Sequence, residues 1–178
     1  MTDQISPVRL RELLDYDPED GTLTWRHRPN PTNDRGISMF NGKLAGRKTG
    51  HLGNHGYRSV NIDGRLYLAH RVIWAIMTGD WPIDVIDHRN GVLADNRFCN
   101  LREATRTQNM QNSKMRKDSQ HKLKGIIPRA GGRWAATIQA AKKVHMLGVF
   151  ATPEEAHAAY CAAARELHGD FANFGYVT

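Results

Sequence analysis

The stretch from Ile86 to Asn112 limits the fold of this chain more than any other part of its sequence. It reads IDHRNGVLADNRFCNLREATRTQNMQN and contains five asparagines and one Asp-His pair. Asparagine favours neither helices nor strands, so its concentration here requires turns or site chemistry. The surrounding residues predict two short extended pieces, WPIDVIDH and NRFCNL, joined by a polar loop. A helix from Thr105 to about residue 115 follows, because Thr105 and Gln108 have the spacing of a capping box.

Four polar residues of this stretch have the chemistry of a metal-dependent hydrolytic site. Asp87 can bind Mg²⁺ or Mn²⁺, ions that prefer oxygen ligands. His88, on the opposite side of the same strand, can take a proton from water near neutral pH. Asn109, early on the following helix, can supply a second ligand oxygen. Asn100 ends the second extended piece and can hydrogen-bond across the hairpin to hold the His88 loop in place.

The pattern D-H-x-N-G, N-R-x-x-N-L-R and T-x-x-Q-N-x-x-N closely resembles the motif of HNH endonucleases. The resemblance implies the ββα-metal fold, a β-hairpin followed by a helix, and cleavage of phosphodiester bonds with one divalent ion per site. It implies that His88 is the general base and that Asp87 and Asn109 are the metal ligands. Asn100 matches the middle asparagine, which orients the histidine. Asn109 stands at the last motif position, where the family often has histidine.

Other polar residues near the motif have less specific interpretations. We interpret Asn90-Gly91 and Asn96 as loop residues. Arg97 and Arg102, which flank the second extended piece, are candidates to clamp a DNA phosphate, or are solvated arginines. His70, in the preceding helix, is either structural or faces DNA.

The charge of the chain is concentrated in one block. Residues 101–150 contain eleven Lys and Arg and two Asp and Glu, whereas the whole chain has a net charge of +7. Such a block indicates a polyanionic partner, most simply nucleic acid, although a solvated basic surface is the alternative. Cys99 and Cys161 are far apart, which argues against a disulfide framework and a zinc site. Neither a membrane span nor a signal peptide is predicted, so we expect a cytoplasmic protein.

The rest of the chain predicts an α+β fold in four parts. Residues 1–66 form a β-rich N-terminal segment with a helix at Pro7–Tyr16, a hairpin at Asp63-Gly64 and mostly loop between residues 30 and 56. Its basic residues are predicted to contact DNA: Arg26, Arg35, Lys43, Arg47 and Lys48. Residues 67–113 form the ββα-metal nuclease core, opening with a helix at 69–78, and residues 114–122 form a basic linker. Residues 123–174 form a three-stranded antiparallel sheet packed on one helix.

The last part also predicts a DNA-binding face. Strand alternation in RWAATIQ places Arg133, Ala135, Thr137 and Gln139 on one face and Trp134, Ala136 and Ile138 on the other. The second set should pack on the alanine-rich helix that Thr152 opens, while the first can face a DNA groove. The predicted DNA contacts are Lys124, Arg129, Arg133, Thr137, Gln139, Lys142 and Lys143. A merely soluble basic face is the alternative.

Residues 123–174 resemble the plant APETALA2/ethylene-response-factor (AP2/ERF) DNA-binding domain. The resemblance rests on Gly125, Trp134, Leu147-Gly148, Phe150 and the alanine-rich helix, and it implies that the sheet reads double-stranded DNA. Ile127, Thr137 and Gln139 replace residues usual in the plant domains, so the target sequence does not transfer. The order of the parts resembles phage-encoded HNH homing endonucleases.

The sequence therefore predicts a metal-dependent endonuclease that hydrolyses phosphodiester bonds in duplex DNA, in the host cytoplasm if phage-encoded, as a monomer or a dimer. Two other functions stay open. One is a DNA-binding regulator whose nuclease site has decayed. The other is a structure-selective nuclease in phage recombination or packaging.

Overall fold

The N-terminal segment begins with a short helix that turns directly into a strand. In the computed structural model, which describes residues 4–113 and 123–175, helix α1 is Pro7–Leu13, and the Ser6 Oγ caps it by accepting a hydrogen bond from the Arg9 N–H. Strand β1 (Leu14–Asp17) pairs with β2 (Thr22–Trp25), which pairs with β3 (Lys48–Thr49). The predicted helix to Tyr16 is thus too long. Pairing of Leu14 with Trp25 overrides local helix propensity there.

The region between residues 30 and 56, predicted to be mostly loop, contains regular structure. Asp34 caps helix α2 (Arg35–Lys43) by accepting a hydrogen bond from the Ile37 N–H, at 2.9 Å. Two short strands follow, β3 and β4 (His51–Leu52). The prediction missed α2 because the helix contains two glycines and an asparagine, which are poor helix formers. The Asp34 cap starts the helix in spite of them.

The hairpin and the helix predicted next are both confirmed. Strand β4 pairs with β5 (Arg58–Ile62), which pairs with β6 (Arg65–Leu68). Asp63 and Gly64 both have positive φ, as a two-residue hairpin turn requires. Helix α3 (Ala69–Thr78) ends at Gly79 in the left-handed conformation.

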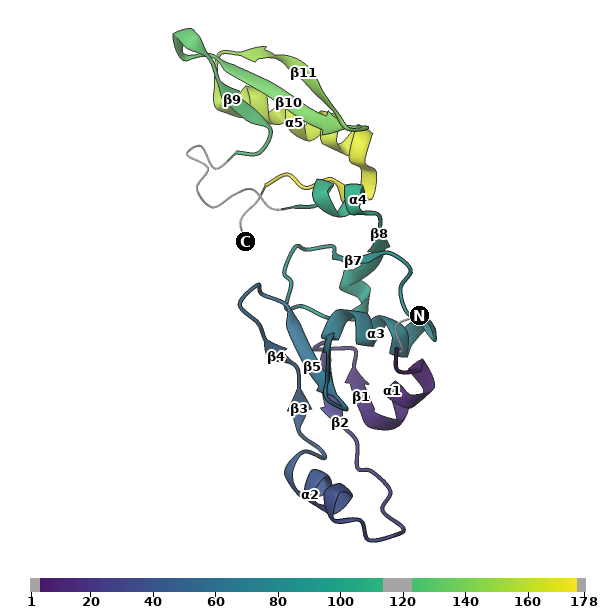
Figure 1. Ribbon diagram of the computed structural model, residues 1–178. Helices are drawn as coiled ribbons and strands as arrows, with labels where there is room; N and C mark the ends of the chain where they lie inside the picture. Colours follow the sequence, from purple (N-terminus) through teal and green to yellow (C-terminus); the bar gives the residue numbers. More distant parts are fainter. Residues whose placement is uncertain (1–3, 114–122, 176–178) are drawn as a thin grey trace. The chain divides into compact units, whose positions relative to one another are not determined.

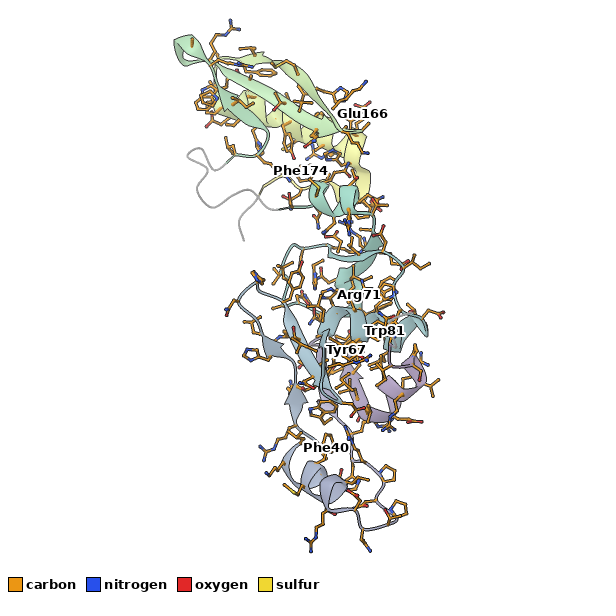
Figure 2. All side chains as sticks on the ribbon, in the orientation of Figure 1. Phe40, Tyr67, Arg71, Trp81, Glu166 and Phe174 are labelled. Atoms are coloured by element: carbon orange, nitrogen blue, oxygen red, sulfur yellow. The ribbon has the colours of Figure 1, made fainter. Side chains whose placement is uncertain are left out.

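One hydrophobic core joins residues from both sides of position 66. Leu10, Leu23 and Val60 pack in the same cluster as Ile73 of α3 and Leu101. Helix α3 is also tied to the loop that follows it, because Arg71 donates to the backbone oxygens of Asp84 and Pro82 (Figure 2). Tyr67 stacks on Trp81, with ring centroids 5.7 Å apart (Figure 2).

Two compact units divide the chain, residues Met1–Ala104 and Thr105–Thr178. The first unit ends with the antiparallel pair β7 (Val85–His88) and β8 (Leu101–Ala104) (Figure 1). The 3₁₀ turn η1 (Phe98–Asn100) lies between them, directly before β8. The second extended piece predicted from NRFCNL is thus a turn followed by a strand.

The second unit begins with helix α4 (Arg106–Gln111), whose Thr105 and Gln108 form the predicted capping box. The helix ends at Asn112, and residues 114–115 of the predicted helix lie outside the described part, as does the predicted linker. Strands β9 (Ile126–Pro128), β10 (Trp134–Ala140) and β11 (Lys143–Phe150) form an antiparallel sheet in the order β11-β10-β9. Short 3₁₀ turns lie at Ala130–Gly132 (η2) and Gly169–Phe171 (η3).

Helix α5 (Pro153–His168) packs on this sheet (Figure 1). Thr152 and Glu155 form its capping box. Ile138 packs against Tyr160, Cys161 and Ala164 of the helix, as predicted. The strict alternation predicted for β10 is interrupted, because the pairing register shifts between Ala136 and Thr137 and both Ala135 and Ala136 are fully buried.

The whole is a mixed α+β fold of small antiparallel sheets and helices. Across residues 4–113 and 123–175, none of the helices combines the length and apolar character needed to cross a membrane.

Candidate functional site

Strand β7 places the Asp-His pair at its C-terminal end. Asp87 lies opposite Arg102 of β8, and His88 lies opposite Leu101. Successive side chains of a strand point to opposite faces, so the carboxylate and the imidazole lie on different sides of the hairpin. Both are buried, with 4% of Asp87 and 2% of His88 exposed. Burying two such polar groups requires specific partners for each.

The partner of Asp87 is Arg102. Its Oδ2 accepts a hydrogen bond from Arg102 Nε at 2.7 Å and lies 2.6 Å from Arg102 Nη2 in an ion pair, and both side chains are over 90% buried. A buried carboxylate is tolerated when a cation balances its charge. Arg102 was predicted to clamp a DNA phosphate. Such a contact stays a prediction, and it requires that this buried pair open first.

The imidazole of His88 contacts an amide and two rings. Its Nε2 lies 3.1 Å from Asn96 Oδ1, and its ring centroid is 5.1 Å from that of His70 and 6.0 Å from that of Tyr57. Burial lowers the pKa of His88, against the opposing effects of the Asn96 hydrogen bond and the Asp87 charge. The neutral imidazole is therefore favoured, which is the form that a general base requires.

Asn96 was interpreted as a loop residue, and the structure gives it a further role. It is 1% exposed and holds His88 through its side-chain oxygen. An asparagine in a polar loop is usually a turn former, and no periodicity marks this one. Its burial and its tertiary contacts, which the sequence does not reveal, distinguish it from the exposed Asn90.

The N-terminal hairpin fixes the segment that contains Asn96. The Tyr16 hydroxyl accepts a hydrogen bond from the Phe98 N–H at 2.7 Å and donates one to the Asn96 carbonyl at 3.2 Å. Gly21, with φ of +72°, lies so close that a Cβ there would be 2.5 Å from the Arg97 nitrogen. Residues before position 66 therefore support the loop that holds His88.

Asn100 braces the same loop from its other end. Its Oδ1 accepts from the Asn90 N–H at 3.0 Å, its Nδ2 donates to the Asp95 carbonyl at 2.8 Å, and its carbonyl accepts from the Arg89 N–H at 2.9 Å. These hydrogen bonds cross the hairpin in the way that the sequence predicted. Any catalytic role of Asn100 stays a prediction.

Arg97 forms a bidentate pair at the rim of the loop. Its Nε and Nη2 donate to the two oxygens of Asp95 at 2.8 and 2.6 Å, and this pairing lowers the pKa of Asp95 to about 2. Nearly half of the Arg97 side chain is exposed. The Arg97 guanidinium is therefore accessible to a DNA phosphate from solvent, and that contact stays a prediction.

Asn109 is in the second unit, on α4, where its side chain is partly exposed. In the described part of the chain, no group of three or more His, Cys, Asp or Glu side chains is arranged to hold a metal. Mg²⁺ does not require such a group, because it keeps several waters and binds through one or two carboxylates and substrate phosphates. Asp87 and Asn109 each carry an oxygen donor of the kind that Mg²⁺ prefers, and their role as its ligands stays a prediction.

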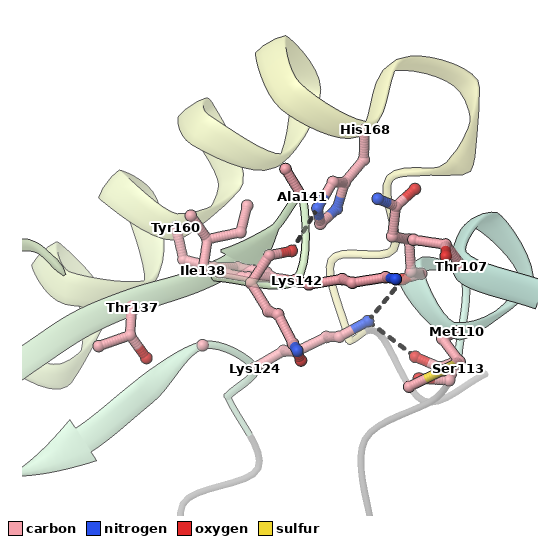
Figure 3. Close-up of a pocket in the computed structure, with 13 residues that line it drawn as sticks. Thr107, Met110, Ser113, Lys124, Thr137, Ile138, Ala141, Lys142, Tyr160 and His168 are labelled. Atoms are coloured by element: carbon pink, nitrogen blue, oxygen red, sulfur yellow. Dashed lines mark hydrogen bonds between the residues drawn. The ribbon is translucent and has the colours of Figure 1, made fainter. Parts of the chain in front are cut away.

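The predicted DNA contacts of the second unit separate into two groups. Arg129, Arg133 and Lys143 are exposed, and Arg133 Nη2 donates to the Val149 carbonyl at 3.3 Å. Lys124, Thr137, Gln139 and Lys142 line one cavity of about 470 Å³ between the sheet and α4 (Figure 3), and of these Gln139 and Lys142 are also exposed. Lys124 is mostly buried there and donates to backbone oxygens.

The buried His70 gives a testable pH dependence of stability. Burial, then the His88 and Arg71 charges, lower its pKa from 6.5 to about 3. The unfolded chain therefore binds a proton between about pH 6.5 and 3 that the folded chain does not, so stability falls as pH falls through this window. We expect chemical denaturation without metal to give an unfolding free energy about 2 kcal/mol lower at pH 5 than at pH 8. In the His70→Phe variant, the difference in unfolding free energy between pH 8 and pH 5 should be smaller. If the variant shows the same difference as the wild type, His70 is not its cause.

A comparison with known protein families finds a similarity over one stretch of the chain. Residues 67–111 match the family model described as HNH endonuclease. No curated protein and no solved structure matches the chain significantly. The matched range contains the Asp-His pair, Asn96, Asn100 and Asn109. This stretch is therefore similar to HNH endonucleases.

Proposed function

We propose that this chain is a metal-dependent DNA endonuclease of the HNH homing type that hydrolyses phosphodiester bonds in duplex DNA. The observation that supports this most is the buried His88, next to Asp87 in the sequence and inside the residues that match the HNH family. Burial lowers the pKa of His88 and so favours its neutral form. The pair β7–β8 and helix α4 follow one another as the strands and helix of a ββα-metal core do.

His88 acts as the general base in this proposal. An amide oxygen can only accept, so the Asn96 contact places the imidazole hydrogen on Nε2 and the basic lone pair on Nδ1. Nδ1 then takes the proton of the attacking water. Asn96 and Asn100 position His88, the first through the ring and the second through the loop backbone.

Asp87 and Asn109 are the residues that would hold one Mg²⁺ or Mn²⁺ ion. The chemistry that such an ion supplies when bound is Lewis-acid stabilisation of charge on the scissile phosphate and the leaving 3′ oxygen. Arg102, the ion-pair partner of Asp87, would be the cation available to the phosphate at this site.

The second unit would provide the affinity for double-stranded DNA, as an AP2/ERF-like domain. Arg129, Arg133 and Lys143 are exposed cations on its strands and turns, in the block of the sequence with the highest positive charge. Phosphate contacts of this kind position a protein on duplex DNA. A phage-encoded enzyme of this type would work in the host cytoplasm.

A plasmid assay tests the proposal. Supercoiled plasmid incubated with the purified chain should give nicked or linear DNA with Mg²⁺ or Mn²⁺ and remain intact with EDTA. Binding without cleavage under all these conditions would favour a regulator with a decayed site. Mapped ends that follow DNA structure instead of sequence would favour a structure-selective nuclease.

The charge block predicts strongly salt-dependent binding. If about four to six phosphates are contacted, the logarithm of the association constant should fall with the logarithm of salt concentration at a slope of roughly −4 to −5. Fluorescence anisotropy with a labelled duplex, without divalent metal, measures this slope. Replacing Lys143 by alanine should reduce it by about one. A slope near zero would contradict an electrostatic DNA contact.

A further inference from the structure

Helix α4 is too short to be stable by itself. It has six residues, and none of them from Arg106 to Gln111 is buried. Isolated helices of this length are marginal in water, so partners outside the helix must hold it. Its N-terminus is closed by its own capping box, whereas the last carbonyls of a helix have no partner within it. The carbonyl of Gln111, the last residue of the helix, and those of Asn112 and Ser113 just after it take their donors from elsewhere.

The donors come from the two ends of the sheet-and-helix module, residues 123–175. Lys124 Nζ donates to the Gln111 carbonyl at 3.1 Å and to the Ser113 carbonyl at 2.7 Å (Figure 3). Asn173 Nδ2 donates to the Asn112 carbonyl at 2.9 Å. Three consecutive carbonyls at the end of α4 are thus bound by two side chains, which we name the α4 clamp.

Both residues of the clamp are fixed by their own module. The Lys124 carbonyl lies 2.9 Å from His157 Nδ1 of α5, and the Asn173 carbonyl accepts from the Tyr160 hydroxyl at 3.1 Å. The Gly175 N–H donates to Asn173 Oδ1 at 2.8 Å, which fixes the amide so that Nδ2 faces α4. A Cβ on Gly175 would lie 2.8 Å from the Lys124 Cβ, so the two ends of the module are tightly packed.

The charge of Lys124 suits this position. An ammonium group at a helix C-terminus interacts favourably with the helix dipole. Lys124 is mostly buried, and burial lowers its pKa to about 8. A lysine whose head group is bound to two carbonyls has fewer donors left for a DNA phosphate than the exposed Lys143. The predicted DNA contact of Lys124 is therefore replaced by a structural role in our interpretation.

We propose that Lys124 and Asn173 are positioning residues of the nuclease: by fixing α4 they fix Asn109, so the DNA-binding module also sets the place of a metal ligand. The proposal rests on the proposed function, in which Asn109 is that ligand. Asn109 precedes the first clamped carbonyl by two residues, so any fraying of the helix end reaches it directly. The module would then control cleavage as well as affinity.

The test uses full-length variants and three measurements. Lys124→Met, Asn173→Ala and the double variant should lose hydrogen-exchange protection in peptides covering residues 105–113. At saturating duplex DNA with Mn²⁺ their single-turnover cleavage rates should fall roughly 10- to 100-fold, as misplacement of a site group does. DNA affinity should change by less than about twofold, because the exposed cations remain. Glu166→Gln, an exposed α5 change (Figure 2), is the control and should alter none of these.

Each other outcome is decisive. Unchanged exchange protection, or lost protection with wild-type cleavage at saturating DNA, would overturn the clamp. Weaker DNA binding with a normal saturated rate would make Lys124 a phosphate contact and also overturn it. If Lys124→Met does not fold, Lys124→Arg, which keeps a cation with donors, should retain protection within a few-fold. Wild-type protein that never cleaves would count against the proposed function alone, and the exchange measurement would still decide the clamp.

Discussion

Replacing His88 by alanine should lower the single-turnover rate of DNA cleavage by roughly 10²- to 10⁴-fold, the usual contribution of a general base. Duplex affinity should be nearly unchanged, because the imidazole is buried and bound to Asn96 and is not exposed to phosphate. Quenched-flow cleavage at saturating DNA measures the first quantity, and anisotropy without divalent metal measures the second.

Two further variants make this experiment specific. His55 is exposed, so His55→Ala should cleave at the wild-type rate. His88→Gln keeps a polar group in the buried position, and should remain folded while losing the same activity. A folded His88→Ala protein that cleaves at the wild-type rate would remove the basis for the site assignment.

Replacing Asp87 should have two large effects at once. Asp87→Leu removes a proposed ligand, so cleavage should disappear. It also leaves the Arg102 guanidinium buried without its carboxylate, and breaking a buried ion pair in this way lowers the unfolding free energy by about 3–5 kcal/mol. Urea denaturation without metal measures the second effect independently of the first.

A double variant separates the loss of cleavage from the loss of stability. Asp87→Leu combined with Arg102→Met replaces the whole pair by apolar side chains, and should recover most of the stability without recovering cleavage. If the double variant is as unstable as Asp87→Leu, the ion pair is not the reason for the instability. If it cleaves DNA, Asp87 is not the ligand.

Features of this fold that depend on local chemistry could be predicted from the sequence. The Asp63-Gly64 turn, the left-handed Gly79 at the end of α3 and the capping boxes of Thr105 and Thr152 each involve residues within a few positions of one another. Their conformations follow from the residues themselves. The hydrogen bonds of Asn100 across the hairpin were predictable for a similar reason, because a known motif specifies that spacing.

Features that depend on distant partners could not be predicted. Tyr16 seemed to end a helix, yet it lies in a strand whose partner is Leu23. Asn96 seemed to be a loop residue, and only folding places it against His88. Arg102 seemed to be a surface arginine, and only folding places it against Asp87. Lys124 was grouped with the basic residues around it, although its ammonium binds carbonyls more than ten positions earlier.

The contact of Tyr16 and Gly21 with the loop after His88 defines which segment can be exchanged between proteins. A recombination event or a fusion design that begins at residue 67 would transfer the whole motif but leave behind the hydroxyl that holds Asn96 and Phe98. The smallest portable cassette therefore begins with α1, some sixty positions before the motif does. A graft of this motif onto another scaffold should therefore have its upstream junction before Ser6.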